Sequence, residues 1–328
     1  MFEPIMATPV RTTGPIPVTL DNFVRAETDL YFAKKVAEDG FGKLQHSRTI
    51  ADVNNQTVVR MNRDTIYSSG VFDLNAAPVT FTLPDVGKRF MSLQAVNQDH
   101  YTLDVVYGPG IFTYDRTKAD TRYVFFIIRT LANPNDPEDL RAANMAQDAI
   151  KVQQTSKGKW EAPTWDSASR DMIRAKLNAL GEMGYSGERF GAKKEVNPIA
   201  HLIGTAIAWG GNPSYAAVYQ GTYPKANDGK TVYRLTVKDV PVDGFWSITV
   251  YNSTGFFPKN DLDAYSLNSL TAKPNSDGSF TIQFGGCARN TLNCLPIIAG
   301  WNYTVRLYRP RKEIIDGEWK FPEARPVS

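Results

Sequence analysis

The chain has 328 residues and a formal net charge of +3, with 42% hydrophobic and 22% charged residues. This length allows two ordinary domains with sizeable cores, and the composition is that of a globular protein rather than a disordered one. Because acidic and basic residues nearly balance, the sequence offers no basic surface that would bind nucleic acid. No apolar run reaches the roughly 18 residues of a membrane-spanning helix, so we expect no membrane span.

The first half of the chain predicts one helix followed by a β-sheet domain. The helix is expected over residues 19–40, with Thr19 as its cap and Gly40 at its end, because apolar residues recur on one face. From about residue 57 the segments become rich in β-branched and aromatic residues separated by turn formers, which is typical of strands. The expected strands are 58–67, 79–85, 89–97, 101–108 and 122–130, and we interpret them as a sandwich-like domain.

Three helices are expected next. Each begins at a residue that can cap it, namely Asp136, Asp166 and Asn197, and the first and last of these are followed by proline. The helices are expected to run to about residues 153, 184 and 209. Gly210 and Gly211 would end the third.

From residue 230 onward the alternation of apolar and polar residues is regular and one-sided, which is typical of an antiparallel sandwich or jelly roll. The segments are 233–239, 245–252, 279–286 and 302–310. The sequence therefore predicts a mainly β protein with helices, an α+β fold. Two antiparallel β-sandwich or jelly-roll-like modules, residues 1–212 and 213–328, would be joined by a helical segment.

The chain has two cysteines, Cys287 and Cys294, which follow a predicted strand at a spacing that the end of a hairpin could bring together. We favour a disulfide over two buried thiols, and a disulfide would indicate an oxidising compartment. The first 17 residues contain no apolar core of signal-peptide length. The compartment is therefore left open: periplasmic or secreted if the two cysteines are bridged, and cytoplasmic otherwise.

Several catalytic motifs are missing from the sequence. It contains no G-x-S-x-G, Walker, G-x-G-x-x-G or H-E-x-x-H pattern, which argues against a standard hydrolase, kinase or nicotinamide enzyme. We expect no cofactor. The chain has three histidines, and nothing in their spacing indicates a metal site, so no metal ligand is assigned.

The first candidate site is the charged group in residues 61–67. If 58–67 is a strand, Asn62 and Asp64 share one face, and Arg63 shares the other with Tyr67. A guanidinium beside a phenol is a common way to hold an anion. The alternative is a structural bridge between Arg63 and a carboxylate, because buried paired charges are more often structural than catalytic.

The second candidate site follows the strand at 89–97. Asp99, His100 and Tyr101 lie at its end, where loops often carry function. A histidine next to a phenol and carboxylates is a candidate general acid or base, although it could equally hydrogen-bond a backbone carbonyl. A third candidate is His201, which shares a helix face with Thr205; the alternative is a satisfied core histidine.

Six segments resemble a two-module bacterial family. They are NRDTIYS, RFMSLQ, NPIAHLIGTAIAWGGNP, DGFWSITVYN, DGSFTIQFGG and RLYRPRKEIIDGEWKFP. The modules of this family are called domain of unknown function 1254 and domain of unknown function 1214, in that order, and the resemblance spans about residues 18–326. It implies two β-rich, jelly-roll-like modules and a chain that is often exported. It carries no catalytic residues over.

Two functional hypotheses follow. In the first, the chain is an enzyme of hydrolase or lyase type that acts on a small polar or anionic molecule at the junction of the modules. His100, Asp64 and Asp99 would then be catalytic, and the ligand would be bound by Arg63, Asn62, Tyr67, Tyr101 and His201. This hypothesis requires Arg63 and His100 to border one pocket. In the second, the chain is a non-catalytic envelope protein that binds a small ligand or forms homo-oligomers, with its charged group closed to solvent.

Overall fold

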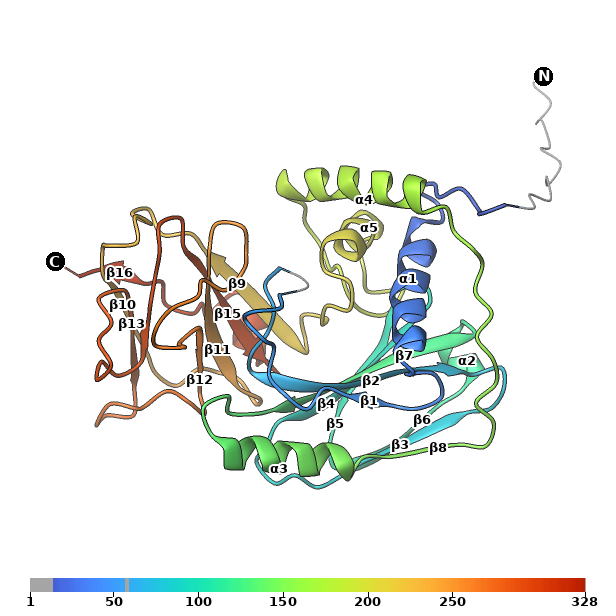
Figure 1. Cartoon of the computed structure of the whole chain (residues 1–328), viewed down its shortest axis with the longest axis horizontal. Coiled ribbons are helices and arrows are strands. Elements are labelled where there is room, and N and C mark those ends of the chain that lie inside the picture. Colours follow the sequence, from blue (N-terminus) through green and yellow to red (C-terminus); the bar gives the residue numbers. More distant parts are fainter. Residues whose placement is uncertain (1–13, 57–58, 328) are drawn as a thin grey trace, which may run out of the picture.

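The structure is a computed structural model that describes residues 14–56 and 59–327. The first 13 residues, in which the sequence shows no leader core, lie outside this range, and so do residues 57 and 58 at the start of one expected strand. Two β-sandwiches lie beside each other, and helices cover the first of them (Figure 1). Mainly antiparallel strands with additional helices give the α+β fold that the sequence predicts.

The N-terminal module consists of two antiparallel sheets. The larger has the order β1-β2-β7-β4-β5, and the smaller has the order β6-β3-β8. Aromatic side chains such as Phe72, Phe81 and Phe126 fill the space between the sheets and are fully buried. The strands are β1 Gln45–His46, β2 Thr65–Asp73, β3 Val79–Leu83, β4 Met91–Asn97, β5 Thr102–Tyr107, β6 Gly110–Tyr114, β7 Tyr123–Leu131 and β8 Lys151–Gln154.

Helices cover both faces of the five-stranded sheet. On the upper face in Figure 1, Phe32 of α1 packs against Val71 of β2 and Phe125 of β7, and α4 and α5 pack against α1. On the lower face, Ala143 of α3 packs against Ile66 of β2. The helices are α1 Phe23–Ala37, α2 Arg116–Ala119, α3 Pro137–Asp148, α4 Ser167–Glu182, α5 Pro198–Ile207 and α6 Lys312–Ile315.

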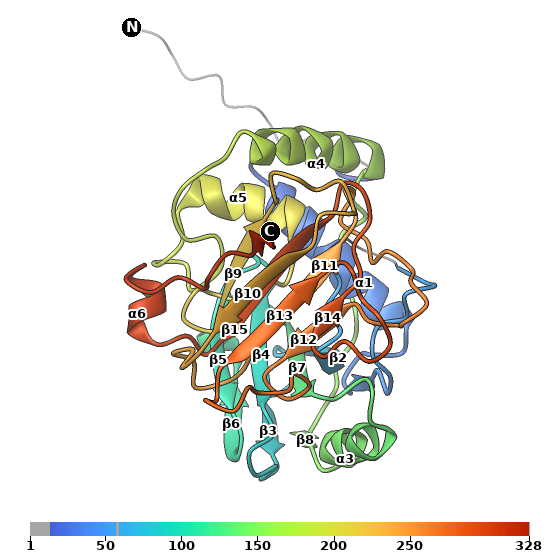
Figure 2. The same ribbon diagram turned by 90° about the vertical axis from the view of Figure 1, so that its left-hand side faces the viewer.

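The C-terminal module is a sandwich of two four-stranded sheets, with the orders β14-β13-β10-β16 and β12-β11-β15-β9. All strand pairs are antiparallel except β13 with β14. Figure 2 views the molecule from the side of this module, whose strands run diagonally in front of the five-stranded sheet, with α4 above and α3 below. The strands are β9 Ala217–Thr222, β10 Tyr233–Val237, β11 Trp246–Tyr251, β12 Ser266–Asn268, β13 Phe280–Phe284, β14 Cys294–Leu295, β15 Asn302–Tyr308 and β16 Arg325–Pro326.

Several local predictions are confirmed. Asp136, Asp166 and Asn197 cap α3, α4 and α5, and each side chain accepts hydrogen bonds from backbone N–H groups of the first turn. The expected strands from residue 79 onward are found within a few residues of their predicted ends. The sulfurs of Cys287 and Cys294 form a disulfide, with 5.6 Å between the two Cα atoms.

Other local predictions are wrong. The strand expected over 58–67 begins only at Thr65, because the described residues before it bend toward the C-terminal module. The helix expected to continue to about residue 153 ends at Asp148, and residues 151–154 form β8 instead. Thr19 does not cap α1, because the chain makes a turn over 19–22 before the helix begins at Phe23.

The polar face of one C-terminal sheet is buried at the junction of the modules. In β11 and β15 the apolar residues face the sandwich core, as the alternation predicts. Their polar neighbours, however, are also buried: Ser247, Thr249, Thr304 and Arg306 are each at most 6% exposed. Hydrogen bonds from Arg306 to the carbonyl of Arg60 tie this face to the chain before β2. The junction is thus a polar interface between two apolar cores.

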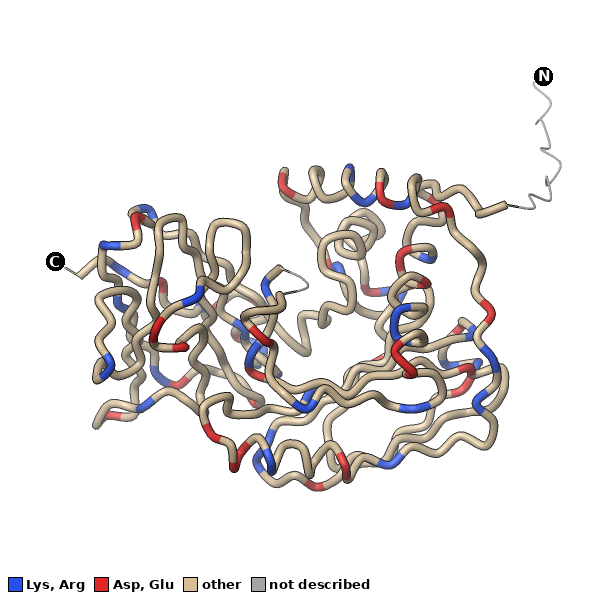
Figure 3. The backbone as a smooth tube through the Cα atoms, viewed as in Figure 1, with Lys and Arg blue, Asp and Glu red and all other residues tan. Residues whose placement is uncertain are grey.

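Within the described residues, no helix is both long and apolar enough to cross a membrane. Lys and Arg residues alternate with Asp and Glu residues along both modules (Figure 3).

Candidate functional site

The residues that the sequence singles out lie in two groups, at opposite ends of the five-stranded sheet. Thr65, the first residue of β2, pairs with Leu131 of β7, so the segment 62–64 lies at that end. The turn that carries His100 follows Asn97, which pairs with Val124 at the other end of β7. Along β7, Val124 and Leu131 are seven residue steps apart, or about 23 Å. The structure therefore does not bring Arg63 and His100 into one pocket.

Asp64 belongs to the junction. Its side chain is fully buried, its Oδ1 accepts a hydrogen bond from Asn268 of β12 at 3.1 Å, and its Oδ2 has no hydrogen-bond partner. Burial raises the pKa of the Asp64 carboxyl, and the nearby Arg306 opposes this shift. Burial dominates because, among residues 14–56 and 59–327, no cation forms an ion pair with the carboxylate. The Asp64 carboxyl therefore holds the two modules together and is closed to solvent.

Asn62, Arg63 and Tyr67 also lie at the junction, and each is half-buried. The Asn62 amide donates to the Tyr308 hydroxyl of β15 at 2.8 Å. Arg63 donates to the carbonyl of Ala51 at 2.6 Å, and its guanidinium lies 5.2 Å from the centre of the Tyr265 ring. Of the residues that the sequence predicts as ligand-binding, these three lie together at the junction.

Arg306 sits in a row of polar side chains on the buried face of the C-terminal sheet. Strand pairing aligns Asn268 with Ser247, Ser247 with Arg306, and Arg306 with Tyr219. Arg306 is 4% exposed and donates to the Tyr251 hydroxyl at 2.6 Å. The other end of the row reaches solvent, because Tyr219 is 38% exposed.

A second row crosses the upper face of the N-terminal sheet. Strand pairing aligns Tyr67 with Arg129, Arg129 with Ser92, and Ser92 with Tyr107. The Arg129 guanidinium lies 5.8 Å from the centre of the Tyr67 ring, and the Arg309 guanidinium lies 4.5 Å from that of Tyr107. Burial raises the pKa of Tyr107 to about 12, which keeps its phenol protonated and able to donate.

Arg129 is buried without a counter-ion. It is 6% exposed, and it donates to the Gln94 side chain at 2.8 Å and to the Gly210 carbonyl at 3.2 Å, which are both neutral acceptors. Within the described residues it forms no ion pair. Arg89, which donates to the carbonyl of Leu131 at the same end of the sheet, does pair with a carboxylate, that of Asp139. An unpaired guanidinium this deep is costly unless something else balances its charge.

The unpaired charge is not confined to Arg129. Within the described residues, four further arginines around the junction make hydrogen bonds to amides, hydroxyls and carbonyls or lie over tyrosine rings, and these four form no ion pair. Together with Arg129 we call them the junction arginines: Arg60, Arg63, Arg129, Arg306 and Arg309. The carboxylate of Asp64 offsets part of this positive charge, at Arg306.

At the other end of the sheet, His100 belongs to a column of stacked rings. His201 lies between Tyr101 and His100, at 4.6 and 5.6 Å between ring centres. Trp209 lies on the other side of His100 at 5.4 Å, and Tyr31 of α1 stacks on Trp209 at 4.4 Å. We call these residues the ring column. The column clamps the turn after β4 against α5 and α1.

Hydrogen bonds use both nitrogens of His100. The hydroxyl of Thr205 donates to the carbonyl of His201, so it accepts from Nδ1 of His100 at 2.7 Å. Nε2 accepts from the N–H of Gly210 at 2.8 Å. This arrangement requires the neutral imidazole, and burial together with the neighbouring His201 holds the pKa of His100 well below its ordinary value. No lone pair of His100 is left to act as a base.

His201 and Asp99 are likewise engaged in the fold. The ring nitrogens of His201 lie 3.0 Å from the carbonyl oxygens of Arg189 and Asp99, so both are used within the fold. The Asp99 carboxylate accepts from Nε of Arg25 at 2.9 Å. His100, Tyr101, Asp99 and His201 are thus close together, as a structural clamp rather than around a cavity.

Gly210 connects the two groups. Its N–H donates to Nε2 of His100, and its carbonyl accepts from Arg129. Gly210 has a φ of +76°, a conformation that glycine adopts without steric cost. The position of Arg129 in the junction is therefore linked to the ring column through this one residue.

The sequence reasoning missed Arg129, Arg306 and Trp209. Arg129 offers a signal, since it is the only charge in the otherwise apolar run YVFFIIRTL of β7. In the alternating pattern of β15, Arg306 falls on the polar face. Alternation distinguishes the two faces of a strand but does not show what covers the polar one. Within the described residues, no three histidine, cysteine, aspartate or glutamate side chains gather as metal ligands.

Two family models match the chain. The one described as Protein of unknown function (DUF1254) matches residues 41–113, and the one described as Protein of unknown function (DUF1214) matches residues 214–312. The two models occur in the order that the sequence resemblance implies. No curated protein matches the chain.

Solved structures share the fold. The VPA0106 protein from Vibrio parahaemolyticus superposes with a TM-score of 0.69 at 18% identity, over 94% of this chain and 98% of that one. An uncharacterised protein from Burkholderia cenocepacia gives a TM-score of 0.52 at 13% identity, over 94% of this chain and 87% of that one. At these identities the likeness shows the fold alone.

Proposed function

We propose that this chain, which belongs to the two-module family in which a DUF1254 region precedes a DUF1214 region, binds a small anionic molecule at the junction of its modules. Both regions are described as of unknown function, so the proposal is based on the geometry. The observation that carries it is the buried guanidinium of Arg129, which has only neutral partners among the described residues.

Charge balance gives the reason. A buried cation is tolerated when a carboxylate, a phosphate or another anion shares its surroundings. The other junction arginines, including Arg60 and Arg309, add positive charge, and the buried Asp64 is bonded to Asn268. A bound anion would supply the missing charge. Guanidinium groups suit carboxylates and phosphates because they donate two parallel hydrogen bonds.

The neighbouring phenols would orient the ligand. Tyr67 and Tyr107 lie in the same row as Arg129, and both are half-buried, so solvent reaches them. Asn62, Arg63 and Tyr67 keep the ligand-binding role that the sequence suggested for them, with Arg129 as the central cation. Sites built on paired strands hold donors more rigidly than loops do.

The proposal assigns binding rather than catalysis. A general base needs a free lone pair close to the ligand. Both nitrogens of His100 are used within the fold, Asp99 is paired with Arg25, and the Asp64 carboxyl is fully buried. The non-catalytic hypothesis therefore has more support than the hydrolase or lyase hypothesis.

The proposal also includes an oxidising compartment, either periplasmic or extracellular. Cys287 and Cys294 are bridged, and such bonds persist mainly outside the reducing cytoplasm. Measuring free thiols in chain taken from the cell envelope, with alkylation before lysis, tests this assignment. Two free thiols would contradict it.

Thermal unfolding with a matched ligand pair tests the binding proposal. Millimolar malonate, a dianion, should raise the Tm, whereas its neutral isostere malonamide should not. At about 100 times its Kd a ligand adds roughly 2.7 kcal/mol, which corresponds to about 5 °C for a chain of this size. Arg129→Met should lose the malonate increment, measured against its own Tm without ligand.

Arg116→Gln is the matched control, since Arg116 is an exposed arginine on α2 with no ion pair among the described residues. It should keep the increment. Equal increments with malonate and malonamide, or an unchanged increment in Arg129→Met, would contradict anion binding at the junction.

A further inference from the structure

A hollow lies at the open edge of the N-terminal sandwich, away from the junction. It has a volume of about 290 Å3 and lies between the edge strand β1 of one sheet and the edge strand β8 of the other. Leu44 lines it beside β1, and Ile150 and Val152 line it beside and within β8. These three side chains also pack against the core between the sheets, so they give the hollow an apolar patch on its floor, whereas the larger part of its exposed lining is polar.

The rim of the hollow is cationic. Lys43 and Lys157 line it, both are exposed, and none of the lining residues is acidic. Lys43 forms a surface ion pair with Asp39, whereas Lys157 forms no ion pair within the described residues. Such a cavity, with an apolar patch on its floor and two ammonium groups at its mouth, suits a molecule with an apolar body and one negative end.

His46 adds a directed donor. Its Nδ1 lies 2.7 Å from the hydroxyl of Ser68, which is fully buried and accepts from the Gln147 amide at 3.0 Å. The Ser68 hydroxyl proton has no other acceptor among the described residues, so it donates to Nδ1. The neutral imidazole must then carry its proton on Nε2. Since His46 lines the hollow, this N–H is available to a ligand.

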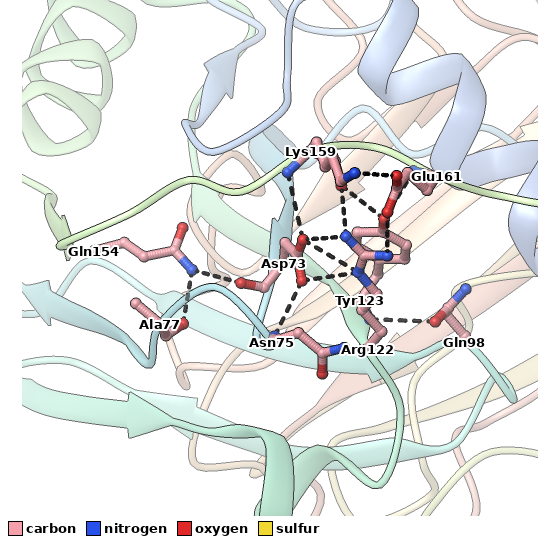
Figure 4. Close-up of polar contacts among 9 residues, drawn as sticks. All are labelled: Asp73, Asn75, Ala77, Gln98, Arg122, Tyr123, Gln154, Lys159 and Glu161. Carbon is pink, nitrogen blue, oxygen red and sulfur yellow. Dashed lines mark hydrogen bonds and ion pairs between the residues drawn. The ribbon is translucent and has the colours of Figure 1, made fainter.

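The walls of the hollow are held in place. A Cβ added at Gly42, whose φ is +67°, would lie 2.6 Å from the Cβ of Lys157, so the two walls meet closely at a glycine. Figure 4 shows how the chain around Lys157 is fixed: Arg122 bridges Asp73 at 2.8 Å and Glu161 at 2.7 Å. Asp73 is 1% exposed, so this bridge anchors the segment to the end of β2.

Gln154 fixes the wall that β8 contributes. Its amide donates to the carbonyls of Asp73 at 3.0 Å and Ala77 at 2.8 Å, as Figure 4 also shows. A cavity between two anchored edge strands is largely preformed. Binding of a ligand there therefore costs little conformational entropy of the protein.

We infer that this hollow binds a small monocarboxylate with a compact apolar body, such as an aromatic or short branched acid. The carboxylate would lie between Lys157 and the Nε2–H of His46, and the apolar body would contact Val152 and its neighbours. A cavity of about 150 Å3 holds one benzene ring, so this hollow has room for the ring and its carboxylate. This site is independent of the anion site at the junction.

Nitrogen-detected NMR of the histidine rings in the full chain tests the inference. The chain has only three histidines, so His46→Gln assigns the His46 signals directly. Benzoate should shift the Nε2 resonance of His46 in a saturable manner, and the neutral isostere benzamide should bind at least tenfold more weakly. Val152→Trp, which fills the hollow, should abolish the shift.

Two lysine substitutions distinguish a specific contact with the carboxylate from general electrostatic attraction to the protein surface. Lys157→Gln should weaken benzoate binding roughly three- to tenfold, whereas Lys151→Gln, on the same strand region but outside the lining, should leave it unchanged. Arg129→Met should also leave it unchanged, which distinguishes this site from the junction. Equal binding of benzamide, retained binding in Val152→Trp, or loss of binding in Arg129→Met would overturn the inference.

Discussion

The two ends of the five-stranded sheet both carry buried charged groups, but they balance them differently. Around the ring column two buried or half-buried cations have anionic partners: Glu27 of α1 is fully buried and pairs with Arg174 of α4 at 2.8 Å, and Asp99 pairs with Arg25. Arg189, which lies over the rings of Tyr185 and Phe190, is the exception. At the junction, within the described residues, Arg129 and the other junction arginines have neutral partners. The first arrangement is complete without a ligand, and the second is not.

The difference shows why residue type alone is a poor guide to function. Histidine, aspartate and tyrosine cluster in the turn after β4, the composition expected of a catalytic site, yet the ring nitrogens of His100 and the carboxylate of Asp99 bond within the fold. The junction contains tyrosines together with arginines whose positive charge has no anionic partner among the described residues. An excess of charge that the chain does not balance is therefore the better indicator of a binding site.

The largest expected effect comes from breaking a complete pair. Glu27→Gln leaves Arg174 without its buried carboxylate, and we expect the free energy of unfolding to fall by about 3 kcal/mol. The value lies at the low end for buried pairs, because 26% of the Arg174 side chain is exposed. Denaturant unfolding of the two proteins measures the difference.

Glu182→Gln provides the control, since Glu182 is exposed at the end of α4 and forms no ion pair among the described residues. It should change the stability by less than about 0.5 kcal/mol. If Glu27→Gln also changed the free energy of unfolding by less than this amount, the stability of the ring-column end would not depend on paired charges.

The second effect is a pH dependence at the ring column. The unfolded chain protonates His100 below about its ordinary pKa of 6.5, whereas the folded chain keeps the ring neutral. The unfolded state then binds more protons, so stability is lost as the pH falls below 6.5, by up to about 1.4 kcal/mol per pH unit. His100→Asn should flatten this part of the stability curve.

His46, whose pKa is also lowered by burial, contributes a slope of the same sign and should leave a residual pH dependence in His100→Asn. Measuring the free energy of unfolding from pH 7 to pH 5 in both proteins gives the comparison. A slope that is unchanged by His100→Asn would show that His100 becomes protonated in the folded state.

The third prediction concerns the unpaired guanidinium of Arg129. Arg129→Met removes an unpaired cation together with its hydrogen bonds to Gln94 and Gly210. Removing the buried charge stabilises the fold because its desolvation cost disappears, whereas losing the hydrogen bonds destabilises it. The two contributions nearly cancel, so we expect the free energy of unfolding without ligand to change by no more than about 1 kcal/mol. Denaturant unfolding at low ionic strength measures it. A loss of 3 kcal/mol or more would place Arg129 among the paired, structural charges.

The smallest effect is expected at Asp64. Burial raises the pKa of its carboxyl, so the folded chain keeps the proton at a pH where the unfolded chain has lost it, and stability falls as the pH rises above 3.8. Asp64→Asn removes this contribution and should change stability at pH 7 by no more than about 1 kcal/mol. Unfolding curves between pH 4 and pH 7 test the sign, and a stability that rises through the range because of Asp64 would contradict it.

Much of the fold could be predicted from sequence because its signals are local. Capping by Asp136, Asp166 and Asn197 marks the helices, and two-residue alternation marks the strands of the C-terminal module. Short edge strands such as β1 and β8 were missed, since two to four residues carry little pattern.

The site could be predicted only in part, because it depends on which faces meet. The sequence singled out Asn62, Arg63 and Tyr67, which the structure gathers at the junction. The sequence could not show that the length of β4 keeps them apart from His100. Nor could it show that the polar face of β15 is buried. Strand register and module packing are long-range properties, and a local pattern does not encode them.

The most direct test of the central claim observes the guanidinium of Arg129 itself. In arginine side-chain NMR, with the Arg129 signal assigned by its loss in Arg129→Met, titration with malonate should shift that signal along a saturable curve. The signal of Arg116 should stay in place. A shift of all arginines that grows linearly with ionic strength, or an Arg129 signal that does not respond, would contradict anion binding at the junction.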